Sequence, residues 1–431
     1  MSPVRTLALA LALCPAALAT DLHVDPLAGD DLTGTGAAGA PFATAGKALS
    51  LATAGDTVHL APGHYAPSTG ETFPWDLPAR VTLQGAGIHQ TKISGEGGHT
   101  LIETADQSLV SDLHLERGDV GVFSQMKPFD VHVVRRCRFQ DNAIALHFRD
   151  DLHVDGTLVL VNSAVIGNDV ALRHESPDND FQSVTLLVYG STITNNADAI
   201  HFVGWGERYL GLYDSIVRGN LDDSLSDYLV TMGVTSNLLA DPAWVGTFGN
   251  LDAPPGILSL ADRDPHLAAT GAARDHATIA PPWPPAGYWT GSGDWIWEAS
   301  YAEVADIDGD PRLVGPFGDA GCDELAAPTL HLNAPATLGG PVELRLQAEP
   351  GASLLAFGGF ATYTAPLGGF LWIAPPWISL GSATMGVSGL AGLTVPIPAD
   401  PALAGLDLYL QALELTTPLV GSGPEWVRLL P

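Results

Sequence analysis

Seven polar or aromatic side chains in the middle of the chain are spaced so that they could form one ligand-binding surface. They are His147, Arg149, Asp150, Arg173, Glu175, His201 and Trp205. Imidazole, guanidinium and carboxylate groups hydrogen-bond to sugar hydroxyls, and an indole ring can stack on a pyranose face. Two carboxyl groups about 6.5–9.5 Å apart would also suit an inverting glycosidase. The set points to carbohydrate chemistry if the fold brings its members to one face.

Three aspartates, Asp306, Asp308 and Asp310, alternate in the stretch "ADIDGDPRLVGPFGDAGCDE". Acids at alternate positions are typical of calcium loops, but a helix-loop-helix calcium loop also needs glycine at position 6 and glutamate at position 12. Counted from Asp306, those positions hold Pro311 and Phe317, which excludes that class. Two interpretations stay open: a looser, structural Ca²⁺ site, or an aspartate-rich turn without a metal. No other cofactor is expected.

Internal repeats predict the elements that position these side chains. The segments "CRFQDNAIALHF", "SAVIGNDVALRH", "STITNNADAIHF" and "SIVRGNLDD" begin at Cys137, Ser163, Ser191 and Ser215, and each follows an apolar or alternating strand. Repeats of this length, built from short strands and turns without helical periodicity, predict an all-β parallel β-helix (solenoid). Each repeat also places an asparagine five residues after its first residue: Asn142, Asn168, Asn196 and Asn220.

The repeats assign roles to two sets of positions. Asparagine tolerates the left-handed backbone of a sharp bend, and stacked asparagines can hydrogen-bond between turns, so we interpret the four asparagines as a structural ladder. His147, Arg173 and His201 share the tenth position after each first residue, on the solvent face of three successive strands. Because neighbouring strands lie about 4.8 Å apart, the two histidines are too distant to share a zinc ion. A glycan groove and a solvated polar face without a ligand both remain open.

Residues 21–99 contain "LHVDPLAGDD", "APFATAGKALSLATAGDTVHLAPGHY" and "GETFPWDLPARVTLQGAG". This stretch resembles the N-terminal module of unknown function found in secreted pectin-lyase-like proteins. The resemblance implies a right-handed parallel β-helix. The residues themselves predict a short helix that covers its first turn, with Phe42, Ala45, Leu49 and Ala52 on one face and Gly55 at its end. The Asn-Thr-Asp, Gly-His-Gly and Arg-Ile-Lys motifs of polygalacturonase-type hydrolases are absent from the sequence, so no catalytic residue is carried over.

Composition divides the chain into four parts. Residues 1–19 form a basic-then-apolar stretch ending in Ala-Leu-Ala, which predicts a secretory signal peptide and a mature chain starting near Thr20. A lipoprotein anchor at Cys14 is the alternative. Residues 20–240 hold the β-helix with its cap, and the Pro- and Gly-rich residues 241–326 are expected to close it irregularly. Residues 327–431 consist of alternating strands with few charges and predict a small C-terminal β-sandwich.

Charge and hydropathy limit the partners. With 48 acids against 18 bases, the formal net charge is −30. Nucleic acids and anionic membranes would be repelled, and no run reaches the roughly 18 apolar residues of a membrane span. Cys137 and Cys322 are too far apart in sequence to suggest a disulfide framework and are expected to be buried.

The leading hypothesis is an exported, non-catalytic extracellular or cell-surface protein that binds a polysaccharide or cell-surface glycan along the stacked strands. A polysaccharide hydrolase or lyase with a divergent active site is the alternative, and a purely structural rod is a third possibility. The C-terminal sandwich is expected to dock a partner.

Overall fold

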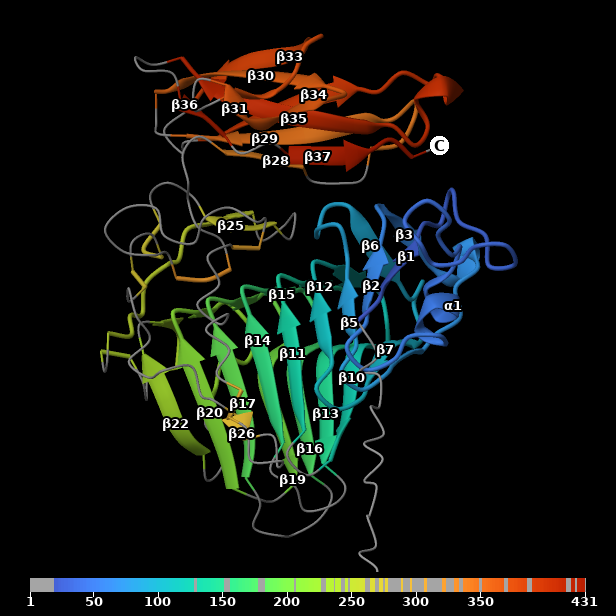
Figure 1. Ribbon diagram of the computed structural model, residues 1–431. Helices are drawn as coiled ribbons and strands as arrows, with labels where there is room; N and C mark the ends of the chain where they lie inside the picture. Colours follow the sequence, from blue (N-terminus) through green and yellow to red (C-terminus); the bar gives the residue numbers. More distant parts are fainter. Residues whose placement is uncertain are drawn as a thin grey trace, which may run out of the picture.

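Short strands separated by sharp bends wind the N-terminal half of the chain into a parallel β-helix (Figure 1). The structure is a computed structural model. Each full turn of the β-helix adds one strand to each of three sheets, and each strand pairs in parallel with its counterpart in the next turn. The structure describes residues 19–431 except 128–129, 151–155, 177–182, 205–206, 226–229, 236, 242–244, 247–248, 260–263, 268–270, 274–275, 278–287, 290–294, 297–305, 308–319, 323–328, 333–335, 349–350, 368–370, 386–389, 416–419, 423–424 and 431.

The three sheets are numbered in the order in which the chain visits them. Sheet 1 has nine strands: β1 (Asp21–Val24), β2 (Thr57–Leu60), β5 (Thr82–Gln84), β8 (Leu109–Ser111), β11 (Val131–Arg135), β14 (Thr157–Val161), β17 (Ser183–Tyr189), β20 (Glu207–Tyr213) and β22 (Val230–Thr235). Sheet 2 has eight: β3 (Gly63–Tyr65), β6 (Thr91–Ser94), β9 (His114–Glu116), β12 (Arg138–Gln140), β15 (Ala164–Ile166), β18 (Thr192–Thr194), β21 (Ile216–Val217) and β23 (Leu238–Leu239). Sheet 3 has six: β4 (Trp75–Leu77), β7 (Thr100–Thr104), β10 (Val120–Met126), β13 (Ile144–Asp150), β16 (Val170–Ser176) and β19 (Asp198–Gly204).

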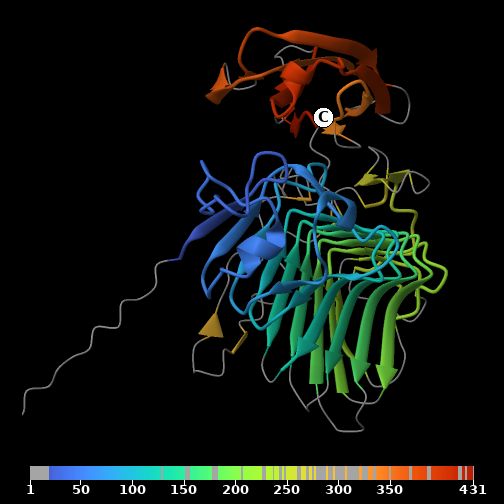
Figure 2. The same ribbon diagram turned by 90° about the vertical axis from the view of Figure 1, so that its right-hand side faces the viewer.

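The core of the β-helix consists of columns of apolar side chains that stack from turn to turn. Alternation along each strand sends every second side chain inward, and the parallel register repeats that choice in the next turn. On sheet 1 the inward column contains Val58, Leu83, Val110, Val134, Leu160, Val188, Leu212 and Val234, all buried. These columns hold the three sheets together and fix which side chains face outward. Figure 2 shows the strands of successive turns stacked side by side.

The bends between sheets depend on residues with a left-handed backbone. At the bend from sheet 2 to sheet 3, Asp141, Gly167, Asn195 and Gly219 have φ between 54° and 82°. Each stands one position before a ladder asparagine. The left-handed residue is therefore the neighbour of the ladder asparagine, and our expectation that the asparagine itself supplies this backbone was wrong.

A short helix covers the first turn of the β-helix. α1 (Ala45–Leu49) begins after Thr44, whose side chain accepts a hydrogen bond from the backbone N–H of Lys47, and its Ala45, Ala48 and Leu49 are buried. The helix ends at Leu49, before the expected Gly55, although backbone hydrogen bonds from Leu51 and Ala52 to the Ala48 carbonyl continue the turn a little further. A 3₁₀ turn, η1 (Pro67–Thr69), follows β3.

Described parts of the segment after β23 lie against the outer face of sheet 2. They include the antiparallel pair of β24 (Ile257–Ser259) with β25 (Asp264–Leu267). The same segment of the chain contains a second antiparallel pair, β26 (Tyr288–Trp289) with β27 (Trp295–Ile296). Ile307 and Cys322 pack on Ala164 and Ile166 of β15, and Ala320 packs near Ile216 of β21. The segment thus buries the apolar outer face of the later turns of sheet 2.

The C-terminal strands form two facing antiparallel sheets around a second core. One contains β28 (Thr329–Leu332), β29 (Pro341–Gln347) and β34 (Leu390–Pro396). The other contains β30 (Ser353–Gly359), β33 (Ile378–Thr384), β35 (Asp407–Glu414), β36 (Val420–Gly421) and β37 (Glu425–Arg428). A two-stranded sheet of β31 (Thr362–Leu367) and β32 (Leu371–Ile373) and a 3₁₀ turn, η3 (Pro401–Leu403), complete the unit.

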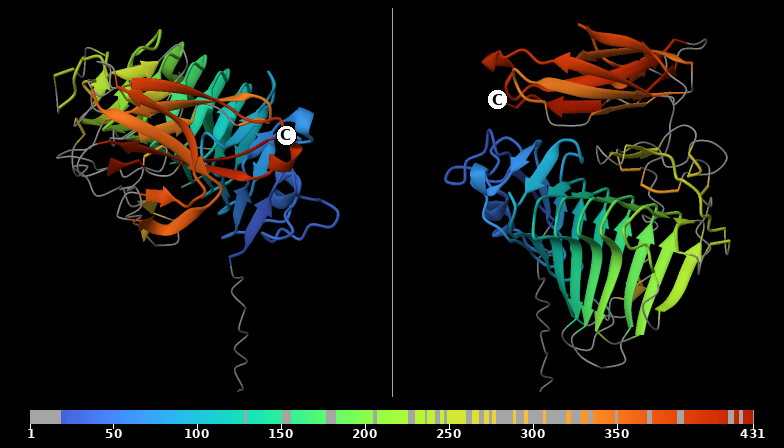
Figure 3. Two further views of the ribbon diagram at one scale, coloured as in Figure 1. Left: turned by 90° about the horizontal axis from the view of Figure 1, so that it is seen from above. Right: turned by 180° about the vertical axis from the view of Figure 1, so that it is seen from behind.

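This sandwich lies alongside the β-helix rather than at its end (Figures 1 and 3). Arg428 of β37 forms ion pairs with Asp407 at 2.9 Å and with Asp25 of the N-terminal module at 3.0 Å. In the part of the chain that the structure describes, no helix has the length and apolar character needed to cross a membrane.

Candidate functional site

One row of outward side chains runs across six consecutive strands of sheet 3. The strand register aligns these residues from turn to turn, and we call them the outer row: Asp76, Glu103, Phe123, His147, Arg173 and His201. Neighbouring members are separated by one strand spacing, about 4.8 Å. Three of the seven side chains considered from the sequence, His147, Arg173 and His201, lie in this row.

A second row, two residues further along the strands, supplies the carboxylate at the centre of the site. Arg149 and Glu175 are register partners in this row. Glu175 Oε2 lies 3.2 Å from His147 Nε2 and 3.6 Å from an Arg173 guanidinium nitrogen. The fold therefore brings a carboxylate, an imidazole and two guanidinium groups together on one face.

The environment of His147 sets its protonation. Burial lowers the pKa of His147, the positive charge of Arg173 acts in the same direction, and Glu175 opposes both. A carboxylate only accepts hydrogen bonds, so in the neutral ring Nε2 carries the proton and Nδ1 is the free acceptor. The Phe123 ring meets the His147 ring edge-on at 5.2 Å, which leaves an aromatic surface beside the polar cluster.

From His147 onwards, the outer row becomes more exposed towards β19. The side chain of His201 is 47 % exposed, and its Nδ1 lies 2.6 Å from Asp198 Oδ2. The side chain of His147 is 13 % exposed and that of Arg173 is 33 % exposed. A ligand that approaches this face from solvent would contact Arg173 and His201 first, because the His147 side chain is the most buried of the three.

The other side chains considered from the sequence are not placed on this face. Trp205, Asp308 and Asp310 fall outside the described residues, and so does the side chain of Asp150 at the end of β13. Asp306 is fully buried beside Ile307. Among the described residues no group of three or more His, Cys, Asp or Glu side chains could hold a metal ion. A calcium ion at this turn stays a prediction.

The four asparagines form a continuous hydrogen-bonded ladder inside the bend between sheets 2 and 3. Asn168 Oδ1 accepts from the backbone N–H and from the side-chain amide of Asn142, at 3.0 Å each. Asn168 in turn donates to Asn196 Oδ1, and Asn196 donates to Asn220 Oδ1. These side chains use their donors and acceptors on one another and on backbone, so they stabilise the turns and do not face a ligand.

A second ladder runs through the bend between sheets 1 and 2. The backbone N–H of each residue donates to the next side chain along the series Cys137, Ser163, Ser191, Ser215, Asn237 and Asn250. Sequence reasoning missed this ladder, although its first four members are the residues at which the repeats begin. The serine that begins three of these four repeats is the sequence signal that could have revealed the ladder.

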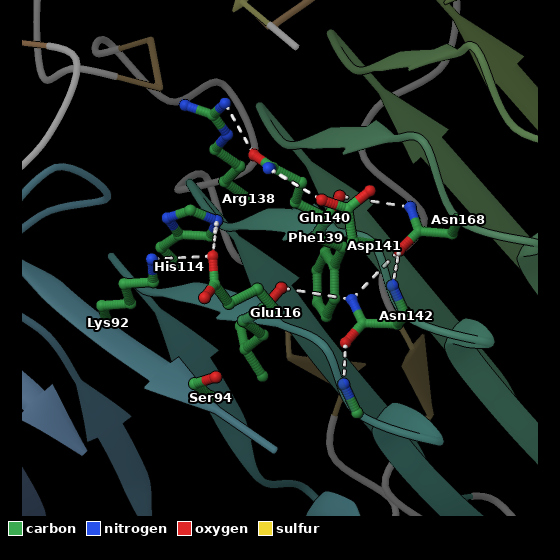
Figure 4. A network of polar contacts seen from close by, with 12 residues as sticks. Lys92, Ser94, His114, Glu116, Arg138, Phe139, Gln140, Asp141, Asn142 and Asn168 are labelled. Atoms are coloured by element: carbon green, nitrogen blue, oxygen red, sulfur yellow. Dashed lines mark hydrogen bonds and ion pairs between the residues drawn. The ribbon is translucent and has the colours of Figure 1, made fainter. Parts of the chain in front are cut away.

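A polar row on sheet 2 was also missed. Register aligns its four members in consecutive turns, and we call them the sheet 2 row: His64, Lys92, His114 and Arg138. Lys92 Nζ lies 2.8 Å from Glu116 Oε2, and His114 Nε2 lies 3.7 Å from the same oxygen (Figure 4). Lys92, His114 and Arg138 are 22 and 24 residues apart, so the repeat spacing could have found them.

A cleft of about 490 Å³ lies where the N-terminal module meets the sandwich. The stacked rings of His23 and His59, whose centroids are 5.0 Å apart, line the cleft together with Arg428. Arg428 is held by two carboxylates, so the cleft contains little unpaired charge.

Comparison with known proteins found similarity to one family profile and to solved structures. The profile of a family described as a protein of unknown function (DUF1565) matches residues 27–108, which contain α1 and the strands β2 to β7. A solved structure titled rhamnogalacturonan lyase is similar to 51 % of this chain and 87 % of its own chain, with 13 % identity and a TM-score of 0.23. No curated protein matches the chain. The N-terminal match and the three-sheet topology fit a pectin-lyase-like, right-handed parallel β-helix protein.

Proposed function

We propose that the protein is exported and binds a polysaccharide along the outer face of sheet 3 without cleaving it. The observation that carries the proposal is the outer row, in which partly exposed aromatic, imidazole and guanidinium groups recur once per turn. A strand spacing of about 4.8 Å is comparable with the length of one sugar unit in an extended chain. Successive turns would therefore meet successive sugars.

The contacts of the row support sugar recognition. Phe123 offers an apolar surface for a sugar ring, and His147 Nδ1 offers an acceptor for a hydroxyl group. Arg149 and Arg173 flank Glu175 on this face. A mainly neutral glycan with occasional carboxylate groups fits the protein better than a dense polyanion, because the whole chain carries a net charge of −30.

The arrangement of the acids favours binding over hydrolysis. Hydrolysis needs two carboxyl groups with separate tasks, one of them free to act as an acid or a nucleophile. Glu175 is engaged by His147 and Arg173, and Asp198 is engaged by His201. Glu175 and Asp198, the carboxylates that contact His147, Arg173 and His201, therefore hold neighbouring side chains in place.

One observation favours a second candidate function, β-elimination from a uronate. A neutral His147 with a free Nδ1 is placed beside Arg173, so a base lies next to a cation that could neutralise a substrate carboxylate. Release of unsaturated uronate from homogalacturonan or rhamnogalacturonan, followed by ultraviolet absorbance, tests this function. Loss of that signal in His147→Ala would support it, and no signal from wild-type protein on any polymer would exclude it.

Binding is tested with a glycan array followed by affinity electrophoresis in the best polysaccharide. Removing Arg173 deletes charge-assisted hydrogen bonds worth about 1.5–3 kcal/mol, so Arg173→Ala should weaken binding by roughly tenfold to hundredfold. Arg218→Ala is the matched control, because Arg218 is also partly buried and ion-paired but follows β21 of sheet 2. Equal loss in both variants, or no binding to any glycan, would contradict the proposal.

Export and partner docking belong to the same proposal. Mass spectrometry of protein recovered from the medium should give a mature N-terminus near Thr20. The sandwich is proposed to dock a partner, supported by Trp377 and Ile378, which are exposed where the edge strand β33 begins. Deletion of residues 327–431 should abolish surface retention and leave glycan binding intact.

A further inference from the structure

The cleft between the N-terminal module and the sandwich has one wall made of register-aligned polar side chains. His23, His59 and Gln84 stand at matching positions of β1, β2 and β5, and all three line the cleft. Their neighbours Val24 and Val58 belong to the core of the β-helix, so alternation along the strands turns the three polar side chains outward. The wall thus repeats a polar side chain once per turn over three turns of sheet 1.

The polar atoms of this wall are only partly used within the protein. The His23 ring stacks on the His59 ring and makes no hydrogen bond to the described residues. His59 Nε2 lies 3.1 Å from Asp21 Oδ1. Gln84 donates to Asp112 Oδ2 at 3.3 Å, and its side-chain carbonyl accepts no hydrogen bond from the part of the chain that the structure describes. The wall therefore offers both donors and acceptors to a molecule in the cleft.

The His23 ring is neutral near pH 7. Burial lowers the pKa of His23, the neighbouring His59 acts in the same direction, and Asp21 opposes both. A neutral imidazole carries one N–H donor and one acceptor nitrogen. This combination matches a hydroxyl group, which also donates and accepts, and it gives no preference to a charged ligand.

Arg428 of the sandwich contributes further donors to the cleft. Its Nε and one terminal nitrogen donate to Asp407, at 2.9 and 3.4 Å, and its other terminal nitrogen donates to Asp25 at 3.0 Å. A guanidinium has five N–H groups, so these three bonds leave two N–H groups without a partner among the described residues. The two carboxylates also fix the position of the guanidinium and offset its charge.

The cleft has the size and position of a small-molecule site. Its volume is about 490 Å³, within the roughly 300–1,000 Å³ of ligand pockets, which occur preferentially where two structural units meet. Figures 1 and 2 show the sandwich next to the N-terminal module. The lining between the polar groups includes the small side chains of Ala38, Pro41, Ala61 and Ala86, which leave room for a ligand and offer it apolar contact.

The charges around the cleft favour an uncharged ligand. Three carboxylates lie near one guanidinium, so an anionic ligand would be repelled. They belong to Asp21, Asp25 and Asp407. Each carboxylate already faces a basic side chain, His59 in the first case and Arg428 in the other two, so a cationic ligand would have to compete with these contacts.

From these observations we infer that the cleft binds a neutral monosaccharide or disaccharide unit, with His23, Gln84 and Arg428 as its polar contacts. Sugar hydroxyl groups would contact the imidazole, the amide carbonyl and the guanidinium N–H groups, and the C–H face of the sugar would lie on the small apolar side chains. Because the cleft is lined by two units, a bound sugar would also hold the sandwich against the N-terminal module. This site involves sheet 1 and does not rest on the glycan face proposed for sheet 3.

The experiment is saturation-transfer difference NMR of the full chain, titrated with glucose, galactose, xylose, cellobiose and lactose. Ala38→Trp places a large side chain in the cleft and should abolish the signal of the sugar that binds. Ala37→Trp is the matched control, because Ala37 is exposed in the same turn but does not line the cleft. His23→Phe keeps an aromatic ring without its nitrogens and should weaken binding by roughly threefold to tenfold. Circular dichroism confirms that each variant is folded.

Galacturonate and glucosamine, titrated under the same conditions, test the charge of the ligand. The inference is supported when a neutral sugar binds more tightly than both, and when its signal is lost in Ala38→Trp but kept in Ala37→Trp. Absence of signal from every neutral sugar would overturn it, and so would tighter binding of galacturonate or glucosamine. Equal signals in wild type and Ala38→Trp, or equal loss in the two tryptophan variants, would overturn it as well.

Discussion

Replacing Asn168 by alanine tests whether the asparagine ladder stabilises the β-helix. The Asn168 side chain makes four hydrogen bonds: it accepts two from Asn142 and donates one to Asn196 Oδ1 and one to the Phe139 carbonyl. Each such bond contributes about 1 kcal/mol net, so Asn168→Ala should lower the free energy of unfolding by about 4 kcal/mol. Asn168 is only 3 % exposed, so water cannot replace the lost partners.

Asn220 at the end of the ladder is the matched control. Its side chain also makes four hydrogen bonds, accepting two from Asn196 and donating to the Ile193 carbonyl and to Asp223. Because Asn220 is only partly buried, water satisfies the groups left behind, and Asn220→Ala should cost about 1–2 kcal/mol.

Urea unfolding followed by circular dichroism measures both variants, and the comparison is valid while the slopes with denaturant agree. Asn168→Leu keeps the side-chain volume without the hydrogen bonds and should be as destabilised as Asn168→Ala. Equal losses in the Asn168 and Asn220 alanine variants, or a loss below about 1 kcal/mol in Asn168→Ala, would refute the reasoning.

Three further predictions follow from the same structure. Arg428→Ala removes the ion pair with Asp25 and should increase the radius of gyration in small-angle X-ray scattering, whereas Arg428→Lys should not; an unchanged radius in the alanine variant would count against the ion pair as a link between the units. Burial raises the pKa of the Cys137 thiol to about 12, so Cys137 and the equally buried Cys322 should react with a thiol reagent only after denaturation; fast labelling of the native protein would be inconsistent with their burial. Lowering the pH below about 6.5 should lower the melting temperature. Histidines such as His114 bind protons in the unfolded chain but stay neutral in the folded protein, because burial lowers their pKa. Stability is thus complete above that pH and is lost below it, and His114→Gln should flatten the dependence; an equal slope in that variant would remove His114 from the explanation.

Much of the β-helix could be predicted because its sequence signals repeat. A single stretch of alternating apolar and polar residues does not say which fold it belongs to. The same alternation in the repeats that begin at Cys137, Ser163, Ser191 and Ser215 predicts both the length of each turn and the positions that face outward. The expectations of an all-β, pectin-lyase-like β-helix with antiparallel C-terminal sheets are confirmed. In the part of the chain that the structure describes, Cys137 and Cys322 form no disulfide, and both are buried, as expected.

Other features depend on contacts that one repeat does not reveal. The left-handed position falls on Asp141 and Asn195 rather than on the ladder asparagines, because the ladder needs its side chains pointing inward while the bend needs a special backbone one residue earlier. The sheet 2 row was missed because its early turns carry few of the repeat's marker residues. The meeting of Arg428 with Asp25, 403 residues apart, leaves no trace in local sequence.

The proposed glycan face is tested most directly by hydroxyl-radical footprinting with and without the best-binding oligosaccharide from the array. Phe123, His147 and His201 should be oxidised less when the ligand is bound, because the sugar would cover the outer row. Trp377, exposed on the sandwich, serves as the internal control and should be oxidised equally in both samples. Protection of Trp377 with unchanged oxidation of His201 would contradict binding along sheet 3.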